Sequence, residues 1–255
     1  MPDLAVLALA AGFAGFVDAL VGGGGLILVP ALFSVYPNAA PAMLFGTNKG
    51  AAVWGTAFAT AQFARRVKLA WGALLPAALA AGVGGLAGAW GVTLVSAQGL
   101  RKALPFVLLG VLVYTLARKE MGRHHEPRFA GRTEALVASA LALVIGFYDG
   151  FFGPGTGSFF VFLFVRLLGY DFLHASASAK LLNTVTNLAA LALFGWTGHV
   201  WWHIAAVMAV ANVVGSLAGT RLALRHGAGF VRAVFIVVVA ALICKTAVDA
   251  FLAAG

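Results

Sequence analysis

Long hydrophobic stretches separated by short polar segments run along the whole chain. They cover residues 4–36, 39–63, 70–95, 100–117, 134–166, 171–195, 200–220 and 229–252. Most of them have about the 20 residues that a helix needs to cross the hydrocarbon core of a bilayer. No repeated alternation of short strands is present, and backbone groups in lipid need hydrogen-bond partners within their own segment. The pattern therefore predicts an all-α polytopic membrane protein.

Composition and charge agree with a lipid environment. Hydrophobic residues make up 62% of the 255 residues and charged residues only 10%, with a mean hydropathy of +0.98. The formal net charge of +9 could suggest nucleic acid as a partner. Most Lys and Arg residues, however, flank hydrophobic stretches in short loops, which is the pattern of membrane topology. We therefore expect the lipid bilayer as surroundings and no nucleic-acid partner.

The first and fifth stretches are longer than a single crossing requires, and glycine-rich segments interrupt both. The first break consists of Gly22, Gly23, Gly24 and Gly25, and the second of Gly153, Pro154, Gly155, Thr156 and Gly157. Each stretch is expected to form a broken helix hairpin that re-enters the side from which it came.

A shift of 131 positions aligns the two halves of the chain without a gap. It places Asp18 on Asp149, Lys49 on Lys180 and Trp71 on Trp202. Matches of these residue types are informative because the chain has only six Trp, six Lys and five Asp. The repeat divides the chain into a first membrane repeat (1–118), a linker (119–133) and a second membrane repeat (134–255).

The distribution of basic residues predicts that the two repeats are inverted. If each broken stretch turns back at its glycines, each repeat crosses the membrane three times, so the second starts from the opposite side. Three of the 17 basic residues (Lys49, Lys180, Lys245) lie within stretches. The other 14 then divide into 12 on one side and only Arg101 and Lys102 on the other. Basic loops prefer the cytoplasm, so we expect both termini outside and the linker in the cytoplasm of a bacterial inner membrane.

The two breaks and the polar residues near mid-membrane depth form the candidate binding site for a small anion. A glycine loop that leads into a helix presents free N–H groups and a positive dipole end. Lysine at this depth usually marks a pathway or a buried partner. Besides both breaks, the candidate substrate-binding residues are Thr47, Asn48, Lys49, Lys180, Asn183 and Asn187. Two alternatives stay open: the breaks could be plain chain reversals, and each lysine could pair structurally with the aspartate of its own half.

Asp18 and Asp149 lie four residues before the breaks, near the C-terminal end of a half-helix. The helix dipole disfavours negative charge there, and desolvation favours a protonated carboxyl group. Both aspartates are therefore candidate proton carriers, and a Lys–Asp ion pair explains them equally well.

The remaining polar residues carry weaker signals. His124 and His125 lie in the linker with no cysteine or carboxylate at metal-ligand spacing, so we expect solvated side chains and no metal site. Asn212, Ser216 and Thr220 form a polar stripe on the seventh stretch that could line the transport path. Ala80, Gly84 and Gly88, repeated as Ala211, Gly215 and Gly219, predict closely packed helices.

Two motifs carry a resemblance to a known family. The segments GFVDALVGGGGLILVPAL at 15–32 and GFYDGFFGPGTGSFF at 146–160 resemble those of the TauE/SafE sulfite-exporter-like (TSUP) anion permeases, and the second is most similar to the YfcA-type branch. The resemblance covers essentially the whole chain. It implies movement of sulfite, sulfonates or related organic sulfur anions across the inner membrane, without fixing the substrate.

The leading hypothesis is a secondary anion transporter, an exporter, that works by alternating access around the paired breaks. Its expected partners are a small anion and, as a coupling ion, the proton; no cofactor is expected, and no oligomeric state is predicted. The alternative is an integral-membrane enzyme that acts on lipid or isoprenoid phosphates. That alternative is disfavoured because the chain has neither an Asp-rich metal motif nor a carboxylate–His cluster in sequence.

Overall fold

The computed structural model describes residues 2–95, 106, 110 and 125–253, which form helices with no strand among them. The elements are α1 (Pro2–Val21), α2 (Gly25–Val35), α3 (Pro41–Ala64), α4 (Trp71–Leu94), α6 (Gly131–Phe151), α7 (Thr156–Leu163), the π-helix η1 (Phe164–Leu168), α8 (Phe172–Trp196) and α9 (Trp202–Ala253). The prediction of an all-α fold is confirmed. Apart from residues 106 and 110, the fourth predicted stretch lies outside the described residues, as do residues 119–124 of the linker.

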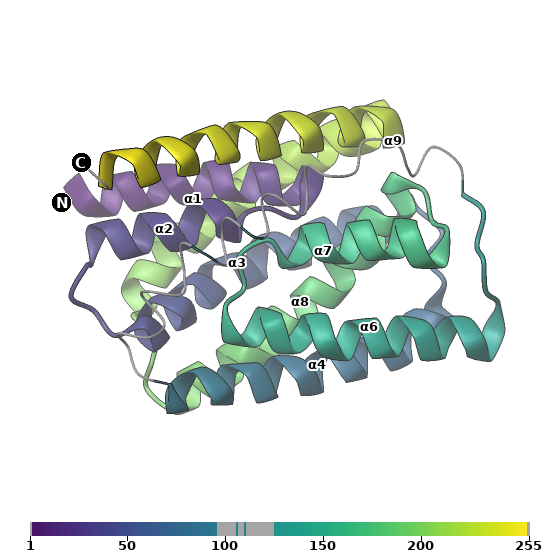
Figure 1. Cartoon of the computed structure of the whole chain (residues 1–255), viewed down its shortest axis with the longest axis horizontal. Coiled ribbons are helices and arrows are strands. Elements are labelled where there is room, and N and C mark those ends of the chain that lie inside the picture. Colours follow the sequence, from purple (N-terminus) through teal and green to yellow (C-terminus); the bar gives the residue numbers. More distant parts are fainter. Residues whose placement is uncertain (1, 96–105, 107–109, 111–124, 254–255) are drawn as a thin grey trace.

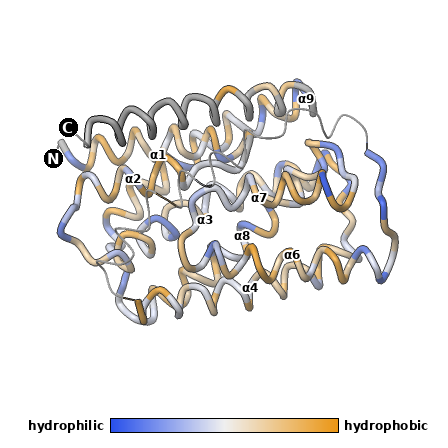
Figure 2. Tube along the Cα trace, viewed as in Figure 1, coloured by the Kyte–Doolittle hydropathy of each residue, from blue (hydrophilic) through white to orange (hydrophobic). Residues whose placement is uncertain are grey.

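Helix length and hydropathy make this a multi-pass membrane protein. Five helical segments are long and apolar enough to cross a bilayer: α1, α4, α6, α8 and the part of α9 up to Gly227. Figure 2 shows hydrophobic residues along these helices and hydrophilic ones gathered towards the two ends of the molecule. Gly227, with φ 74° and ψ −167°, kinks α9 between the seventh and eighth predicted stretches.

The two predicted breaks are present, and in each the first glycine has a positive φ angle. The first separates α1 from α2 and the second separates α6 from α7. Gly22 and Gly153, equivalent in the repeat, have φ angles of +77° and +88°. Only glycine adopts this region without strain. Each break therefore reverses the chain, so that α1 and α2 open towards one end of the molecule and α6 and α7 towards the other (Figure 1).

Helices from the two halves of the chain are interleaved. α4 lies along α6, and its counterpart, the first part of α9, lies along α1 (Figure 1). A Cβ atom on Gly84 would come closer than 3.0 Å to the carbonyl oxygen of Leu143, and one on Gly215 closer than 3.0 Å to that of Gly12. Small residues allow such close backbone contact between membrane helices. The predicted small-residue ridges are thus contact surfaces between the halves.

The arrangement of the helices brings both breaks to the centre of the bundle. α3 and α8, which carry the two candidate lysines, pack against each other through the middle of the molecule. Both ends of the chain lie at one end of the bundle, whereas the segment that precedes α6 lies at the other (Figure 1). The hairpins α1–α2 and α6–α7 therefore enter from opposite ends and meet beside α3 and α8.

Candidate functional site

The two glycine breaks touch each other. The backbone N–H of Ser158 donates to the carbonyl oxygen of Gly22 over 3.1 Å. A Cβ atom on Gly22 would come closer than 3.0 Å to the backbone of Gly157, so the contact depends on the missing side chain. One hydrogen bond and a backbone-to-backbone contact thus join the tip of one hairpin to the tip of the other.

Lys49 and Asp149 form a buried ion pair beside the second break. Lys49 Nζ lies 2.7 Å from Asp149 Oδ2, and both side chains are 2% exposed. α3 supplies the lysine, and the last turn of α6 supplies the aspartate. A buried charge is tolerated only with a close opposite charge or hydrogen-bond partners, which this geometry provides.

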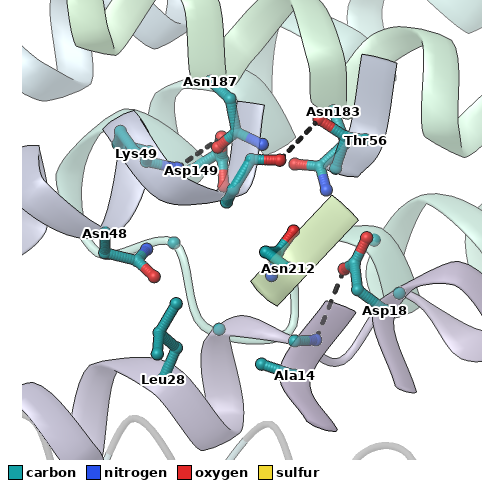
Figure 3. A pocket seen from close by; sticks show the side chains of 16 residues that line it. Ala14, Asp18, Leu28, Asn48, Lys49, Thr56, Asp149, Asn183, Asn187 and Asn212 are labelled. Atoms are coloured by element: carbon teal, nitrogen blue, oxygen red, sulfur yellow. Dashed lines mark hydrogen bonds and ion pairs between the residues drawn. The ribbon is translucent and has the colours of Figure 1, made fainter. Parts of the chain in front are cut away.

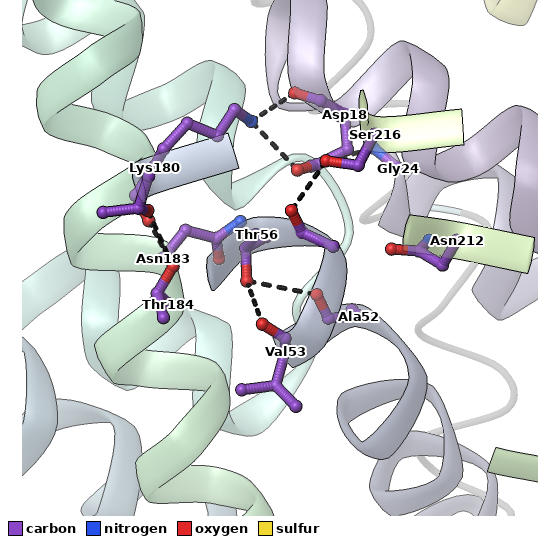
Figure 4. A network of polar contacts seen from close by, with 12 residues as sticks. Asp18, Gly24, Ala52, Val53, Thr56, Lys180, Asn183, Thr184, Asn212 and Ser216 are labelled. Atoms are coloured by element: carbon purple, nitrogen blue, oxygen red, sulfur yellow. Dashed lines mark hydrogen bonds and ion pairs between the residues drawn. The ribbon is translucent and has the colours of Figure 1, made fainter. Parts of the chain in front are cut away.

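The equivalent pair, Lys180 and Asp18, lies beside the first break (Figure 4). Lys180 Nζ is 2.9 Å from Asp18 Oδ2 and also donates to the backbone oxygen of Asp18. The other carboxylate oxygen, Oδ1, accepts from the N–H of Gly24 over 3.3 Å. Lys180 is fully buried, but the Asp18 side chain is 15% exposed. The Lys49–Asp149 pair is thus almost completely buried, whereas Asp18 of the other pair remains partly exposed.

Both ion pairs cross between the two halves of the chain. The alternative in which each lysine pairs with the aspartate of its own half is therefore wrong in its choice of partner, since Lys49 holds Asp149 and Lys180 holds Asp18. The reason is geometric. Each hairpin reaches the centre from its own end, and its last turn before the break lies next to the lysine-bearing helix of the other half.

The lysines also offset the unfavourable electrostatic position of the aspartates at the C-terminal ends of two helices. Asp18 and Asp149 lie in the last turns of α1 and α6, as predicted. The C-terminal end of a helix carries partial negative charge, which destabilises a carboxylate and stabilises a cation. Each ammonium group therefore compensates both a carboxylate and a helix end.

A small cavity lies between the breaks and the two lysine-bearing helices (Figure 3). Its volume is about 30 Å³. The lining consists of Ala14, Asp18, Gly22, Gly24, Gly25, Leu28, Asn48, Lys49, Ala52, Thr56, Asp149, Gly153, Gly157, Asn183, Asn187 and Asn212. Backbone from both breaks, amide side chains and one complete ion pair thus face the same space.

Most residues of the predicted site border this cavity. The amide of Asn48 is 4% exposed, and its Oδ1 has no hydrogen-bond partner among the described residues. Asn183 and Asn187, four residues apart on α8, add two further amides to the lining, and these residues are 6% and 3% exposed. These amides offer both donors and acceptors to whatever enters the cavity.

Three predicted binding residues have other positions. The hydroxyl of Thr47 accepts from the N–H of Trp201 over 3.1 Å, which joins α3 to the start of α9. That of Thr156 donates to the carbonyl of Gly153 over 2.8 Å, within the second break. Lys180 is covered by its contact with Asp18. Gly23, Pro154 and Gly155 belong to the breaks but lie outside the cavity lining.

Two polar residues that line the cavity were not among the predicted site residues. Thr56 bonds back to Ala52 and Val53 of its own helix, over 3.1 and 3.0 Å. Asn212 on α9 donates from Nδ2 to the carbonyl of Ala11 over 3.0 Å, which leaves Oδ1 for other contacts. The signal for Asn212 was the weak polar stripe on the seventh stretch.

The breaks offer fewer free N–H groups than the sequence suggests. The N–H of Gly24 is taken by the Asp18 carboxylate, and that of Ser158 by Gly22. Helix α2 thus already holds one anionic group at its N-terminus, that of Asp18. Negative charge at a helix N-terminus is favourable, and this contact has that geometry.

Comparison with known proteins identifies the family. The sequence model described as "Sulfite exporter TauE/SafE" matches residues 7–246. The chain belongs to the TauE/SafE family. This TauE/SafE member is a membrane transporter, so the predictions of the family and of a non-enzymatic function are confirmed.

Relatives of the TauE/SafE chain are similar over nearly their whole length. "Probable membrane transporter protein ORF9" of Sinorhizobium sp is 36% identical over 246 residues, which is 96% of this chain and 93% of that one. "Probable membrane transporter protein YfcA" of Escherichia coli (strain K12) is 37% identical over 247 residues, 96% and 90% of the two chains. A "Probable membrane transporter protein" of Haemophilus influenzae is 34% identical over 240 residues, 92% and 91%. No solved structure shows significant similarity to this TauE/SafE chain.

The cross-half pairing predicts strong energetic coupling between Lys49 and Asp149. Lys49→Met alone leaves a buried carboxylate without its partner and should cost about 3–5 kcal/mol of unfolding free energy. Adding Asp149→Asn should recover a large part of that loss. The measurement is a double-mutant cycle on unfolding of the detergent-purified protein.

The matched control is the cycle of Lys49→Met with Asp18→Asn, which combines residues of the same half. Its coupling should be much smaller, because Asp18 is bound to Lys180. Equal coupling in the two cycles would contradict the assignment of partners.

Proposed function

We propose that this protein is a secondary transporter of small sulfur-containing anions, such as sulfite or organosulfonates, and that it exports them across the bacterial inner membrane. The observation that carries the proposal is the cavity where the two breaks meet, lined by amides and by a buried Lys–Asp pair. The description of the family model, a sulfite exporter, and the amide and lysine donors of the lining agree in favouring an oxyanion.

The chemistry of the lining suits an anion that can replace a carboxylate. Lys49 faces the cavity, but Asp149 neutralises it. An anion gains the ammonium group once the carboxyl group accepts a proton or moves away. Asn48, Asn183 and Asn187 would then donate to the anion's oxygens. Hydrogen bonds to a charged group are about twice as strong as neutral ones, which favours oxyanions over neutral solutes.

The cavity volume implies that transport requires a conformational change. About 30 Å³ of water-accessible space has room for roughly two or three water molecules. Sulfite, with four heavy atoms, needs more room. We infer that the described conformation is occluded and that the helices separate around the breaks to admit the substrate from one side at a time.

The proposed topology is an inverted pair of repeats, each with three crossings and a re-entrant hairpin. Two observations support it. Basic loop residues divide 12 to two under this arrangement, and the hairpins open towards opposite ends of the bundle (Figure 1). Inverted repeats with broken helices that meet near the midplane recur among secondary transporters. The bilayer is the remaining partner, and residues 119–133 would face the cytoplasm.

Reporter fusions test this topology. Fusions after Gly122 and after Arg66 should both report a cytoplasmic position, because basic loops are retained there. A fusion after Gly255 should report a periplasmic one. If every hydrophobic stretch crossed once, the Gly122 and Gly255 fusions would give the same signal, and the inverted arrangement would be rejected.

Flux measurements test the function itself. Purified protein in proteoliposomes should move labelled sulfite or a sulfonate faster than acetate, with thiosulfate as a further member of the panel. Asn48→Ala should lower the affinity for the transported anion by at least about tenfold, since one hydrogen bond to a charged group contributes roughly 1.5–3 kcal/mol. Asn38→Ala, an exposed asparagine before α3, is the matched control and should transport normally.

Two results would contradict the proposal. The first is a panel in which no sulfur anion moves faster than through protein-free liposomes. The second is a folded Asn48→Ala protein with the affinity and rate of the wild type.

We further propose that an aspartate of the ion pairs carries a proton during transport, and that Asp18 does so more than Asp149. Both aspartates line the cavity, and the Asp18 side chain is 15% exposed, whereas that of Asp149 is 2% exposed. Asp18→Asn keeps the shape of the side chain and removes the titratable proton. It should abolish anion flux driven by a pH gradient and preserve exchange of labelled for unlabelled anion without a gradient.

Asp149→Asn is the matched variant and should reduce gradient-driven flux less. Gradient-driven flux that persists in both variants would rule out a proton carried by either aspartate alone. Failure of Asp18→Asn to fold would favour a purely structural pair.

A further inference from the structure

A second polar cluster lies far from the cavity, where the linker meets the turn between η1 and α8. It contains His125 of the linker together with Asp171 and His174 at the start of α8. Each of these residues offers a ligand atom, and the three atoms lie within 4.8 Å of one another. His125 is exposed, as expected for a solvated linker residue, but a carboxylate and a second imidazole lie next to it. The carboxylate and the second imidazole come from a segment 46 to 49 positions further along the chain.

Asp171 and His174 are held in place by the start of α8. Asp171 is the N-cap residue, and its Oδ1 accepts from the N–H of His174 over 2.8 Å. This bond fixes the carboxylate and leaves Oδ2 facing the imidazole, 2.8 Å from Nδ1. N-cap geometry of this kind is specified by the helix itself. Two of the three ligand groups are thus positioned by backbone structure.

Backbone hydrogen bonds hold the linker next to Asp171 and His174. The N–H of Glu126 donates to the carbonyl of Gly169, and that of Arg128 to the carbonyl of Leu168, both over 2.9 Å. These two bonds place the ring of His125 over that of His174, with 3.9 Å between centroids and 25° between planes. The linker therefore presents His125 at a defined position.

Tyr170 closes the other side of the cluster. Burial, and then its hydrogen bond to Glu134, raise the pKa of Tyr170, so the phenol stays protonated. Its hydroxyl donates to Glu134 Oε1 over 2.5 Å, and its ring lies 5.1 Å from that of His125. Glu134 belongs to the first turn of α6. The cluster therefore joins the linker, α6 and α8.

We propose that His125, Asp171 and His174 form a binding site for a divalent transition-metal cation, with Zn²⁺ as the best match. Two imidazoles and one carboxylate are a ligand set that zinc accepts, with water in the fourth position. Ligand atoms on one tetrahedral zinc lie about 3.4 Å apart. The 2.8 Å between Asp171 Oδ2 and His174 Nδ1 would therefore widen slightly, and the longer separations in the cluster, up to 4.8 Å, would shorten. His125 is the exposed member of the cluster, so its side chain has the most room to adjust.

The bound metal would fasten the linker between the repeats to the turn that leads into α8. α8 carries Lys180, Asn183 and Asn187, so the site lies on the same helix as one ion pair and part of the cavity lining. Metal binding at this position would hold the start of α8 and the linker together.

Calorimetric titration with ZnCl₂ at pH 7.5 tests the site. The full-length protein, purified in detergent without a histidine tag and stripped with chelator, should bind one Zn²⁺ per chain. His125→Ala and His174→Ala should each weaken binding at least about tenfold, as expected when a coordinating group is lost. Asp171→Asn keeps an N-cap oxygen and removes the charge, and it should also weaken binding. His199→Ala changes a histidine beyond the far end of α8 and should bind as the wild type does.

Folding is checked by gel filtration and thermal unfolding without metal. His125→Ala should match the wild type there, because the His125 ring makes no hydrogen bond to another residue of the described part of the chain. Co²⁺ provides an independent signature, since a tetrahedral site gives visible absorption that His125→Ala should remove. The proposal is overturned if no heat of binding is measured. It is equally overturned if His125→Ala and His174→Ala bind Zn²⁺ like the wild type, or if His199→Ala loses binding to the same extent.

Discussion

An ammonium group inside an apolar helix bundle must have an opposite charge within reach, and this requirement organises the centre of the molecule. Lys49 and Lys180 are both almost completely buried, and each has one aspartate beside it. Removing one member of such a pair costs more than the pair itself contributes, because the remaining charge is left desolvated. The hairpin tips can therefore occupy the centre of the bundle only with their aspartates next to the lysines of α3 and α8.

The same constraint connects stability to function. A pair sealed from solvent, such as Lys49–Asp149, is a fixed part of the architecture until something competes for the lysine. Under the proposed function, a transported anion would be such a competitor, and a proton on the carboxyl group would weaken the pair in the same direction. Asp149 is 2% exposed and Asp18 is 15% exposed, so the two carboxylates differ in solvation. The two halves therefore carry the same charged residues at equivalent positions, but their aspartates differ in exposure to solvent.

Much of the fold follows from local features of the sequence. Hydrophobic length sets the helices, as α3 and α8 show by beginning and ending within two residues of their predicted stretches. Glycines at positions that require positive φ set the breaks, and the scarce Asp and Lys residues reveal the repeat. In the cavity, Asn48, Asn183 and Asn187 were found because buried amides on apolar helices are unusual.

Other features depend on how distant segments meet, which spacing along one chain does not encode. Whether Lys49 holds Asp18 or Asp149 is decided by how far the hairpins penetrate past each other. Thr47 looked like a binding residue because it precedes Asn48, but a helix turns by about 100° per residue, so neighbours face different directions. The Thr47 hydroxyl meets the backbone of Trp201 instead. His125 gains its carboxylate neighbour only because backbone bonds bring the linker to the start of α8.

Ion pairs that cross between the halves also bear on how such a protein could have arisen. Within one half, the lysine and the aspartate are each bound by a residue of the other half, so a single half has two buried charges and no partner for either. A half-length ancestor would have met the same requirement by assembling from two copies, with each copy supplying the lysine for the other's aspartate. A fusion of two such copies would preserve both contacts and would allow the copies to diverge. Asn212 and its counterpart Ala81 illustrate this divergence, since one lines the cavity with an amide where the other has only a methyl group.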